Sequence, residues 1–471
     1  MSEIYQAGQF EIQFSQLISS SGQTVDIDYA IVTLTLFEDI ASPVISGQMM
    51  VADSVNLSSM FPLIGQEYLK LKIATAGDSD DSRLIDFTEN ALYVNKISAR
   101  QDMGNGVQAY GISFSSREHR VNERVRVNRS LTGSSTDIVR QVFQNHLGTK
   151  KRLYLEPSAD NRKFVSVNKR PFELIKDMTN LAISQKHNEP CYLCFETYRG
   201  FHFRSLASLY AQQSKQEFFD IKAGTRNKKG AIDIEADFSA IIGFEIVQSQ
   251  DPVLSSRVGT YASTLYVHDI VSKSYQKHIY DYISNFEKEM HIEKTNSRFQ
   301  GDGKEDFPIV SDVIITEDGK NISSFPARTF VQPTSGFGSS NNMVDEFNQN
   351  PFSSNSPEKW LQRRTSQLEQ LKTGYIVRIG VKGSTNIQAG DVVDINLPYT
   401  ASTKTTENEK FDRIYNGKFL VSKIRHDFDN TNAEHTMMIE GVKDSLNREL
   451  PSSTNPEPIQ EGEQEIIDTL Y

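Results

Sequence analysis

Hydrophobic and polar positions alternate through most of the first 118 residues, which predicts β structure. In TVDIDYAIVTLTLFEDI, residues 24–40, apolar side chains lie on one face as far as Ile31 and on the other face from Val32 onward. Because successive strand residues point to opposite faces, this switch predicts a bulge or a twist near Ile31. Further on, two alternating segments flank MGNG and predict a hairpin, since Asn105–Gly106 tolerates positive φ.

Apolar residues at helical spacing predict helices at 56–65, 134–148, 169–185 and 356–374. In the last of these, SPEKWLQRRTSQLEQLKTG, Leu361, Leu368 and Leu371 form the predicted apolar side, and Gly374 ends the helix. Trp360, the single tryptophan, lies on its first turn. We expect it to be a packing anchor rather than an interface residue, with the interface role left open.

Two segments are harder to interpret. REHRVNERVRVNR, residues 117–129, alternates valine with basic residues and predicts a strand with a basic face. SYQKHIYDYISNFEKEM, residues 274–290, fits either a helix or a strand. Between helix 134–148 and residue 205, a second helix and a hairpin turning at Tyr198–Gly200 predict an α+β unit.

The chain repeats a short pattern near its two ends. When Val94 is placed on Val421, the following Lys and Ile residues coincide, and Ile112 falls on Ile439 at the same offset of 327 residues. A glycine precedes a strand upstream of each copy. Hairpins resemble one another by chance, so duplication stays an open alternative, with one testable consequence: Val94 and Val421 should occupy equivalent positions.

These elements suggest the following division of the chain: a first tube-like β-barrel at 1–118, an α+β insertion at 119–205, the first part of a second barrel with connecting elements at 206–300, a long excursion and helix at 301–373, the remainder of the second barrel at 374–448, and a flexible acidic tail at 449–471.

Composition narrows the class of protein. The chain has 471 residues, 37% hydrophobic and 24% charged, which is typical of a globular protein of about three domains. Its net charge of −11 argues against a protein that wraps duplex DNA. We expect no signal peptide and no membrane span. Two cysteines are too few for a secreted disulfide framework and favour a reducing compartment.

Candidate chemistry is sparse. His426 and Asp427 are adjacent, but consecutive strand residues point to opposite faces, so we expect no catalytic pair. Cys191 and Cys194 lack a second cysteine pair for zinc and are expected to be buried. Glu287 and His291 would share a helix face only if that segment is helical. We therefore predict no catalytic, cofactor-binding or metal-binding residues and no cofactor.

Several stretches together resemble the baseplate hub proteins of contractile-tailed bacteriophages: DIASPVISGQMMVADSVNLSSMFPLIGQEYLKLKI, VNKRPFELIKDMTNLAIS, VGTYASTLYVHDIV and YNGKFLVSKIRHDFDNTNAEHTMMIEGVKDS. The resemblance covers most of residues 10–447 and implies a mainly β fold with α+β insertions, made of two tail-tube-like β-barrels plus a smaller α/β domain. It also implies that 259–286 is mainly strand in the second barrel.

The resemblance further implies a structural protein rather than an enzyme. Three chains would form a homotrimeric ring whose six barrels adapt the hexameric tail tube protein to the trimeric central spike protein, beside neighbouring baseplate proteins. Asp39, Ile40, Pro43 and Trp360 are the candidate partner contacts. The protein would be made in the host cytoplasm and reside in the virion tail baseplate.

DNA would pass through the lumen of that ring without specific binding. A trimer carries three times −11, or −33, formal charges, from which we expect an acidic lumen. Two alternatives remain open at this stage: a tail-associated cell-wall hydrolase, and the hub of a related secretion or tailocin injection machine.

Overall fold

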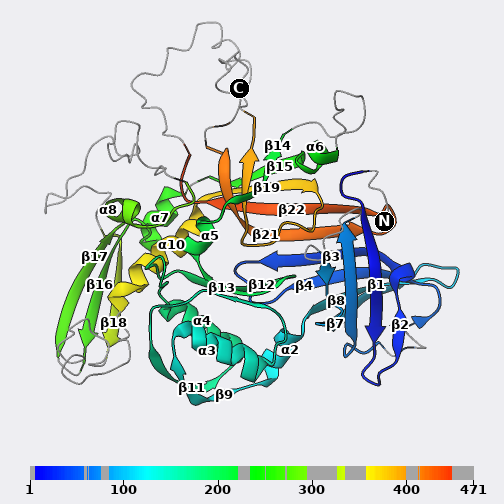
Figure 1. Cartoon of the computed structure of the whole chain (residues 1–471), viewed down its shortest axis with the longest axis horizontal. Helices are drawn as coiled ribbons and strands as arrows, with labels where there is room; N and C mark the ends of the chain where they lie inside the picture. The colour runs from blue at the N-terminus through cyan, green and yellow to red at the C-terminus, as the bar shows by residue number, and fades with distance from the viewer. Residues whose placement is uncertain are drawn as a thin grey trace, which may run out of the picture.

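A computed structural model describes residues 6–57, 61, 63–75, 84–220, 234–249, 251–270, 273–293, 326–334, 357–398, 412 and 414–447. Within these residues one large sheet dominates the molecule, with neighbouring strands in the order β15-β19-β22-β21-β3-β4-β8-β7-β5-β1-β2, while β6, β14 and β20 pair onto it (Figure 1). The sheet has two halves, here called the first and the second β unit, which meet where β3 pairs with β21.

The first β unit has the strands β1 (Phe10–Ile18), β2 (Thr24–Asp26), β3 (Ile31–Asp39), β4 (Ser46–Asp53), β5 (Tyr68–Thr75), β6 (Ile85–Asp86), β7 (Leu92–Asp102) and β8 (Gln108–Ser116). The predicted bulge is confirmed, because the register of β3 against β4 shifts between Ile31 and Thr33. The predicted hairpin is also confirmed, with Asn105 at φ 51° in the turn between β7 and β8. Of the helix predicted at 56–65, residues 58–60 and 62 lie outside the described residues, so its presence stays a prediction.

The second β unit has the strands β14 (Ser214–Phe219), β15 (Ile241–Gln248), β19 (Tyr375–Lys382), β20 (Val392–Asn396), β21 (Gly417–Asp429) and β22 (Glu434–Lys443). Each unit encloses a hydrophobic core of its own, built from the inward residues of its alternating strands. In the first core Val94 is fully buried, and in the second core Val421 is fully buried.

The α+β insertion follows β8. Its elements are α2 (Arg117–Arg124), β9 (Val127–Gly133), α3 (Ser135–Gln141), a π-helical turn (Val142–Leu147), β10 (Leu153–Leu155), β11 (Arg162–Lys169), α4 (Pro171–Leu181), β12 (Tyr192–Thr197) and β13 (Gly200–Ser205). Both predicted helices are present: Gly148, at φ 59°, ends the first and Pro171 begins the second. Their apolar sides pack over a core shared with β12 and β13.

The strand predicted for the basic run 117–129 is wrong over its first eight residues, which form the helix α2. Val121 and Val125 pack on the core of the insertion, and Glu118 and Asn122 are also buried. In a strand, Glu118 and Asn122 would face away from the two valines, whereas their spacing of three and four residues puts all four on one side of a helix. Only the end of the run, in β9, is strand.

The strands β16 (Ala262–Asp269), β17 (Ser274–Asp281) and β18 (Arg328–Thr334) form a separate three-stranded sheet. The short helix α8 (Tyr282–Asn285) and a 3-10 turn (Phe286–Lys288) follow β17, and α7 (Pro252–Val258) precedes β16. The helix α5 (Leu206–Tyr210) contacts β13 instead, and α6 (Ile234–Phe238) contacts β19. Residues 259–286 are thus mainly strand, as expected, but their placement in the second barrel is wrong because this sheet shares no pairing with the large one. The excursion 301–355, apart from 326–334, and the tail 449–471 lie outside the described residues.

The helix α10 (Leu361–Thr373) follows a 3-10 turn (Pro357–Lys359). Its predicted leucine side is only half-buried, whereas its buried residues are polar: Gln362, Arg364, Ser366, Gln367, Gln370 and Thr373. Gln362 Nε2 donates to the Ser263 carbonyl oxygen at 2.9 Å, and an Arg364 guanidinium nitrogen donates to the Tyr192 carbonyl oxygen at 2.9 Å. The helix therefore joins the three-stranded sheet to the insertion through buried hydrogen bonds.

The predicted fold class is confirmed: the described chain is mainly β, with two tube-like β units and a smaller α+β part (Figure 1). No helix within the described ranges is both long and apolar enough to cross a membrane.

Candidate assembly interface

The two β units are joined by a continuous backbone ladder. β21 runs antiparallel to β3, with Lys423 opposite Asp39 at one end and Asp429 opposite Thr33 at the other. Thr35 Oγ1 donates to Asp427 Oδ1 at 3.0 Å across the seam. The core-facing residues of β3 that β21 covers, Leu34 and Leu36, are 0% and 1% exposed. We call this pairing the internal junction.

The hairpins β7–β8 and β21–β22 have the same register. Ile97 lies opposite Ile112 in the first, and Ile424 opposite Ile439 in the second. In both hairpins the register shifts after the equivalent valine, between Val94 and Lys96 and between Val421 and Lys423. The predicted equivalence of Val94 and Val421 is therefore confirmed in pairing, bulge and burial.

The equivalence extends to the next two strands of the sheet, which are β4 and β3 beyond β8 and β19 and β15 beyond β22. Ile31 of β3 lies opposite Val51 of β4, and Ile241 of β15 lies opposite Val381 of β19. A register shift follows each isoleucine, between Ile31 and Thr33 and between Ile241 and Gly243. In this frame β15 is the counterpart of β3, and Phe244 and Ile246 are the counterparts of Leu34 and Leu36.

The two strand edges that meet in the internal junction have counterparts that lie open. In the described chain, β15 pairs with β19 alone, and the segment Lys96–Asp102 of β7 pairs with β8 alone. Phe244 and Ile246 are each 43% exposed, against 0% and 1% for Leu34 and Leu36. An edge strand with exposed apolar side chains is a template for pairing with another chain. The candidate site is therefore this pair of open edges.

A buried carboxylate connects the two units and the insertion. Glu38, 2% exposed, accepts the backbone N–H of Tyr198 at 2.8 Å and that of Ala389 at 2.9 Å. Burial raises the pKa of Glu38 to about 8, against the lowering effect of these two bonds. Tyr198 Oη in turn donates to the Thr385 carbonyl oxygen at 2.5 Å. The tip of the β12–β13 hairpin is thereby held between the units.

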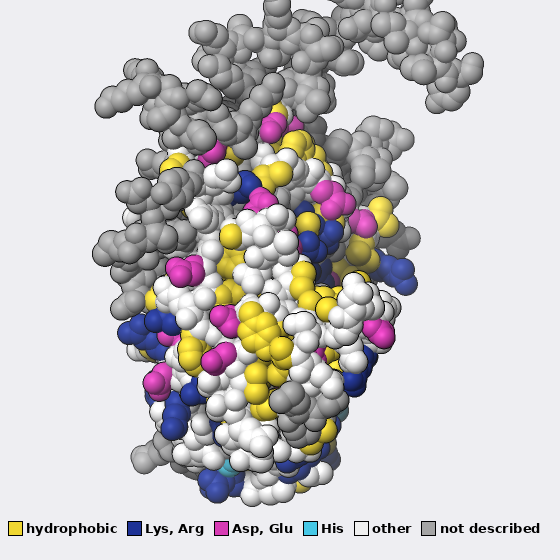
Figure 2. All heavy atoms as spheres, turned by 90° about the vertical axis from the view of Figure 1, so that its right-hand side faces the viewer, with side chains coloured by type: hydrophobic (Ala, Val, Ile, Leu, Met, Phe, Trp, Pro, Cys, Tyr) yellow, Lys and Arg dark blue, Asp and Glu magenta, His cyan; other side chains and the backbone are white. Residues whose placement is uncertain are grey.

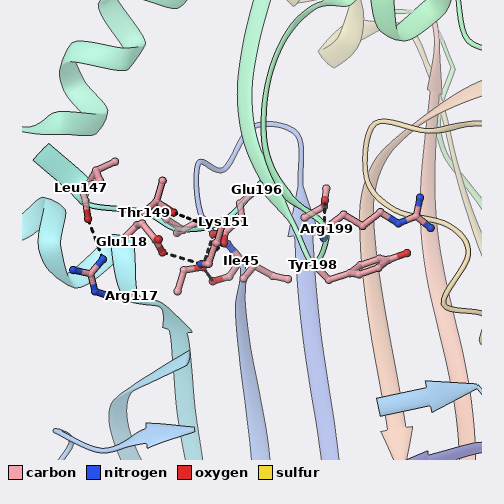
Figure 3. Close-up of polar contacts among 12 residues, drawn as sticks. Ile45, Arg117, Glu118, Leu147, Thr149, Lys151, Glu196, Tyr198 and Arg199 are labelled. Atoms are coloured by element: carbon pink, nitrogen blue, oxygen red, sulfur yellow. Dashed lines mark hydrogen bonds and ion pairs between the residues drawn. The ribbon is translucent and has the colours of Figure 1, made fainter. Parts of the chain in front are cut away.

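A second buried carboxylate anchors the insertion to the first unit. Glu196 accepts the backbone N–H of Ile45 at 2.9 Å and the hydroxyl of Ser116, and it pairs with Lys151 Nζ at 2.6 Å (Figure 3). Lys151 also reaches Glu118 Oε2 at 2.8 Å. Burial lowers the pKa of Lys151, but the carboxylates of Glu196 and Glu118 raise it more, so its amine stays charged. The anchor fixes the insertion beside the start of β4.

The sequence did not single out Glu38 or Glu196. The position of Glu38 in the alternating pattern could have identified it, because it follows Leu34 and Leu36 at every second, core-facing residue of β3. An acidic residue in phase with buried apolar ones indicates a buried polar contact rather than an exposed face.

The predicted contact residues lie in two places. Asp39, Ile40 and Pro43 belong to the end of β3 and its connection to β4. The Ile40 side chain is buried in a cluster that includes residues of the second β unit of the same chain. Its backbone N–H donates to the Ser422 carbonyl oxygen at 3.0 Å. Trp360 is half-buried just before α10, and its indole Nε1 is buried without a partner in the described part of the chain. Contacts of these residues with other proteins stay predictions.

The catalytic interpretation of His426 and Asp427 finds no support. His426 points into the core, where its Nδ1 lies 3.1 Å from Nε2 of His435, and burial lowers the pKa of His426 to about 4. Asp427 lies on the other face, paired with Arg425. His291 Nδ1 lies 2.6 Å from Asp444 Oδ2, a buried contact with the residue that directly follows β22.

The two cysteines point to different sides of their hairpin. Cys191 is buried in the cluster beside β20, and Cys194 is half-buried against the core of the insertion. Burial raises the pKa of Cys191 to about 11. Among the residues that the structure describes, no group of three or more His, Cys, Asp or Glu side chains is arranged to hold a metal ion.

Charges of both signs are mixed on the outside of the first unit. On the face that carries β1 and β2, basic and acidic side chains are interspersed around a band of hydrophobic ones (Figure 2). This is not the single-sign field that holds duplex DNA.

The fold is that of phage tail proteins. It is similar to a tail protein from Neisseria meningitidis MC58, with a TM-score of 0.50 and 9% identity over 93% of this chain and 97% of that one. The 43 kDa tail protein of prophage MuSo2 from Shewanella oneidensis also gives a TM-score of 0.50 and 9% identity, covering 92% and 99% of the two chains.

The sequence is similar to the probable baseplate hub protein gp334 of Vibrio phage KVP40 (isolate Vibrio parahaemolyticus/Japan/Matsuzaki/1991), with 21% identity over 251 residues. The match spans 52% of this chain and 57% of that relative. No family model matches the sequence. The resemblance to phage baseplate hub and tail structural proteins, predicted from the sequence motifs, is confirmed.

Proposed function

We propose that this protein is the structural hub of a contractile phage tail baseplate and that three copies close into a ring. The observation that carries the proposal is the pair of open edges. The internal junction joins β3 to β21, and the counterpart pairing would join β15 of one copy to Lys96–Asp102 of the next. Such a heterologous contact, repeated head to tail, closes into a ring when its rotation permits.

A ring of three copies would present six similar β units. It would thus match the sixfold symmetry of a tail tube protein on one side while keeping the threefold symmetry of a central spike protein on the other. DNA would pass through the middle. Neighbouring baseplate proteins would contact the outside. Asp39, Ile40, Pro43 and Trp360 are the candidate contacts with the partner proteins as a group. The site of action would be the virion tail baseplate, after synthesis in the host cytoplasm.

The same ring would also serve as the hub of a related secretion or tailocin machine. The proteins that bind the ring distinguish this alternative from a phage tail. A cell-wall hydrolase is less well supported, because its one candidate pair is split between the core and the opposite face. The relatives are named as tail and hub proteins, which favours a structural role rather than an enzymatic one.

The mass of the protein in solution tests the ring. Light scattering, with a spike protein added if the hub alone is weakly associated, should show three copies. The variant F244K/I246K places charges on side chains that are already 43% exposed, so each chain should still fold, but the ring should be lost. V165K is the matched control on β11, where Val165 is 62% exposed. A wild-type chain that stays a monomer with both tube and spike proteins would refute the proposal.

A further inference from the structure

Charged residues of alternating sign form a row straight across the large sheet, on the face turned away from the cores. The row crosses β15, β19, β22, β21 and β3, and its members are directly opposite one another: Glu245, Arg378, Glu440, Lys423 and Asp39. We call this row the charge ladder. It spans the second β unit and crosses the internal junction, so it belongs to one face of one continuous sheet.

The members of the ladder neutralise one another at close range. Arg378 reaches Glu440 Oε2 at 3.0 Å and Glu245 Oε2 at 3.4 Å. Lys423 Nζ lies 2.9 Å from Glu440 Oε1, so one carboxylate serves both cations. The Glu440 carboxylate is only 10% exposed, which fixes it between them. Both cations on this row therefore meet a carboxylate of the same chain.

The first β unit carries less charge on the same face. The positions equivalent to Glu245, Arg378 and Glu440 in the strand register hold Thr35, Gln48 and Ser113, in β3, β4 and β8. Thr35 lies opposite Gln48, and Gln48 opposite Ser113. The position equivalent to Lys423 is Lys96, opposite Ser113. Three of the four equivalents are uncharged hydrogen-bonding side chains, with Lys96 the single cation of that row.

We infer that this sheet face is a lining past which double-stranded DNA moves without being held, because the carboxylates of the ladder mask its cations from phosphates. The placement of the face toward DNA rests on the proposed ring. Phosphate binding releases counterions for each cation that it engages, so an unmasked Arg or Lys adds affinity that falls with salt. The ladder would contribute three acidic and two basic residues to the lumen, which is expected to be acidic.

Removing the masking carboxylates tests the inference. The variant E245Q/E440Q keeps Arg378 and Lys423 but removes the carboxylates that contact them in the structure. Fluorescence anisotropy with a labelled DNA duplex should show affinity at least about tenfold higher than wild type at about 50 mM salt, decreasing steeply as salt is raised. The matched control E245Q/E440Q/R378Q/K423Q has no ladder cations and should bind like wild type. Circular dichroism of each variant would confirm that it is folded.

Two results would overturn the masking. One is a folded E245Q/E440Q variant that binds DNA no more tightly than wild type. The other is an equal increase in DNA affinity in the four-substitution control, which would show that the DNA binds somewhere other than the ladder cations. The mass of each preparation, measured in parallel, separates this test from that of the ring. Gain of DNA binding in chains that never associate would support masking while refuting the proposed hub.

Discussion

Val94 and Val421 make the same backbone hydrogen bond in the two halves of the protein. The N–H of Val94 donates to the Glu67 carbonyl oxygen at 3.0 Å, and the N–H of Val421 donates to the Asp391 carbonyl oxygen at 2.8 Å. Each acceptor is an acidic residue just before the neighbouring strand, two residues after Gly65 in one half and directly after Gly390 in the other, and both glycines have positive φ. Few side chains are identical between the two halves, whereas the backbone pairing of the two hairpins is the same.

This equivalence predicts the register of the contact between copies. In the internal junction Thr35 lies opposite Asp427, and the counterparts of these residues in strand pairing are Glu245 and Gln101. The variant Q101C/E245C should therefore form a disulfide between chains under mild oxidation, seen as a ladder of dimers and trimers on a non-reducing gel. Directly opposite residues bring their Cβ atoms within disulfide range.

The same experiment has two matched controls. T35C/D427C, in the internal junction, should form a disulfide within one chain and leave its mass unchanged. Q101C/F244C places the second thiol on the other face of β15, so it should cross-link poorly. If the two interchain pairs cross-link equally, the proposed register is wrong; if neither does, β15 and β7 are not partners.

Substitution of Glu38 should show how much its two hydrogen bonds contribute to stability. E38A leaves the N–H groups of Tyr198 and Ala389 without their acceptor in a buried site, which should cost about 2–5 kcal/mol of unfolding free energy. The two N–H groups bond to different oxygens of Glu38, so E38Q keeps an acceptor for only one of them and should cost an intermediate amount. Urea denaturation of the two variants beside wild type measures the difference, and an equal loss in both would contradict it.

Glu38 also predicts a pH dependence. Its pKa in the folded chain is raised to about 8, so between about 4.5 and 8 the folded state holds a proton that the unfolded state has lost. Its contribution to stability is therefore complete at low pH and decreases as pH rises through that range. E38Q, which does not titrate, should show a smaller decrease in stability between pH 6 and 8 than wild type.

The sequence predicted the hairpins, the bulge near Ile31 and the equivalence of Val94 with Val421 because these depend on local patterns with a period of two. It could not predict the internal junction, since β3 and β21 are almost four hundred residues apart and either could have been a free edge. The basic run was wrongly predicted because Val121 and Val125 fit both a period of two and a spacing of four. The charge ladder could not be predicted from the sequence because its five residues come from five separate strands.

Gly383 should not tolerate a side chain. A Cβ added there would lie 2.0 Å from the ring of His435, which is 1% exposed and stacked on Phe428 with ring centroids 4.1 Å apart. G383A should therefore lose about 1–3 kcal/mol through overpacking. G243A is the matched control, since a Cβ at Gly243 meets nothing within 4 Å. Thermal unfolding compares them, and a G383A variant as stable as G243A would show that the ring can move aside.

The histidine pair should make the second β unit sensitive to acid. Burial lowers the pKa of His426 to about 4, and burial together with the nearby His426 lowers that of His435 well below its usual value. Between pH 6.5 and 4 the unfolded chain binds protons that the folded chain does not, so stability falls as pH falls. For His426 alone the loss is on the order of 3 kcal/mol.

H426L should lose less stability than wild type between pH 6.5 and 4.5, measured by urea denaturation. H268L, at an exposed histidine of β16, should retain the wild-type slope, and an unchanged slope in H426L would show that another group governs acid unfolding.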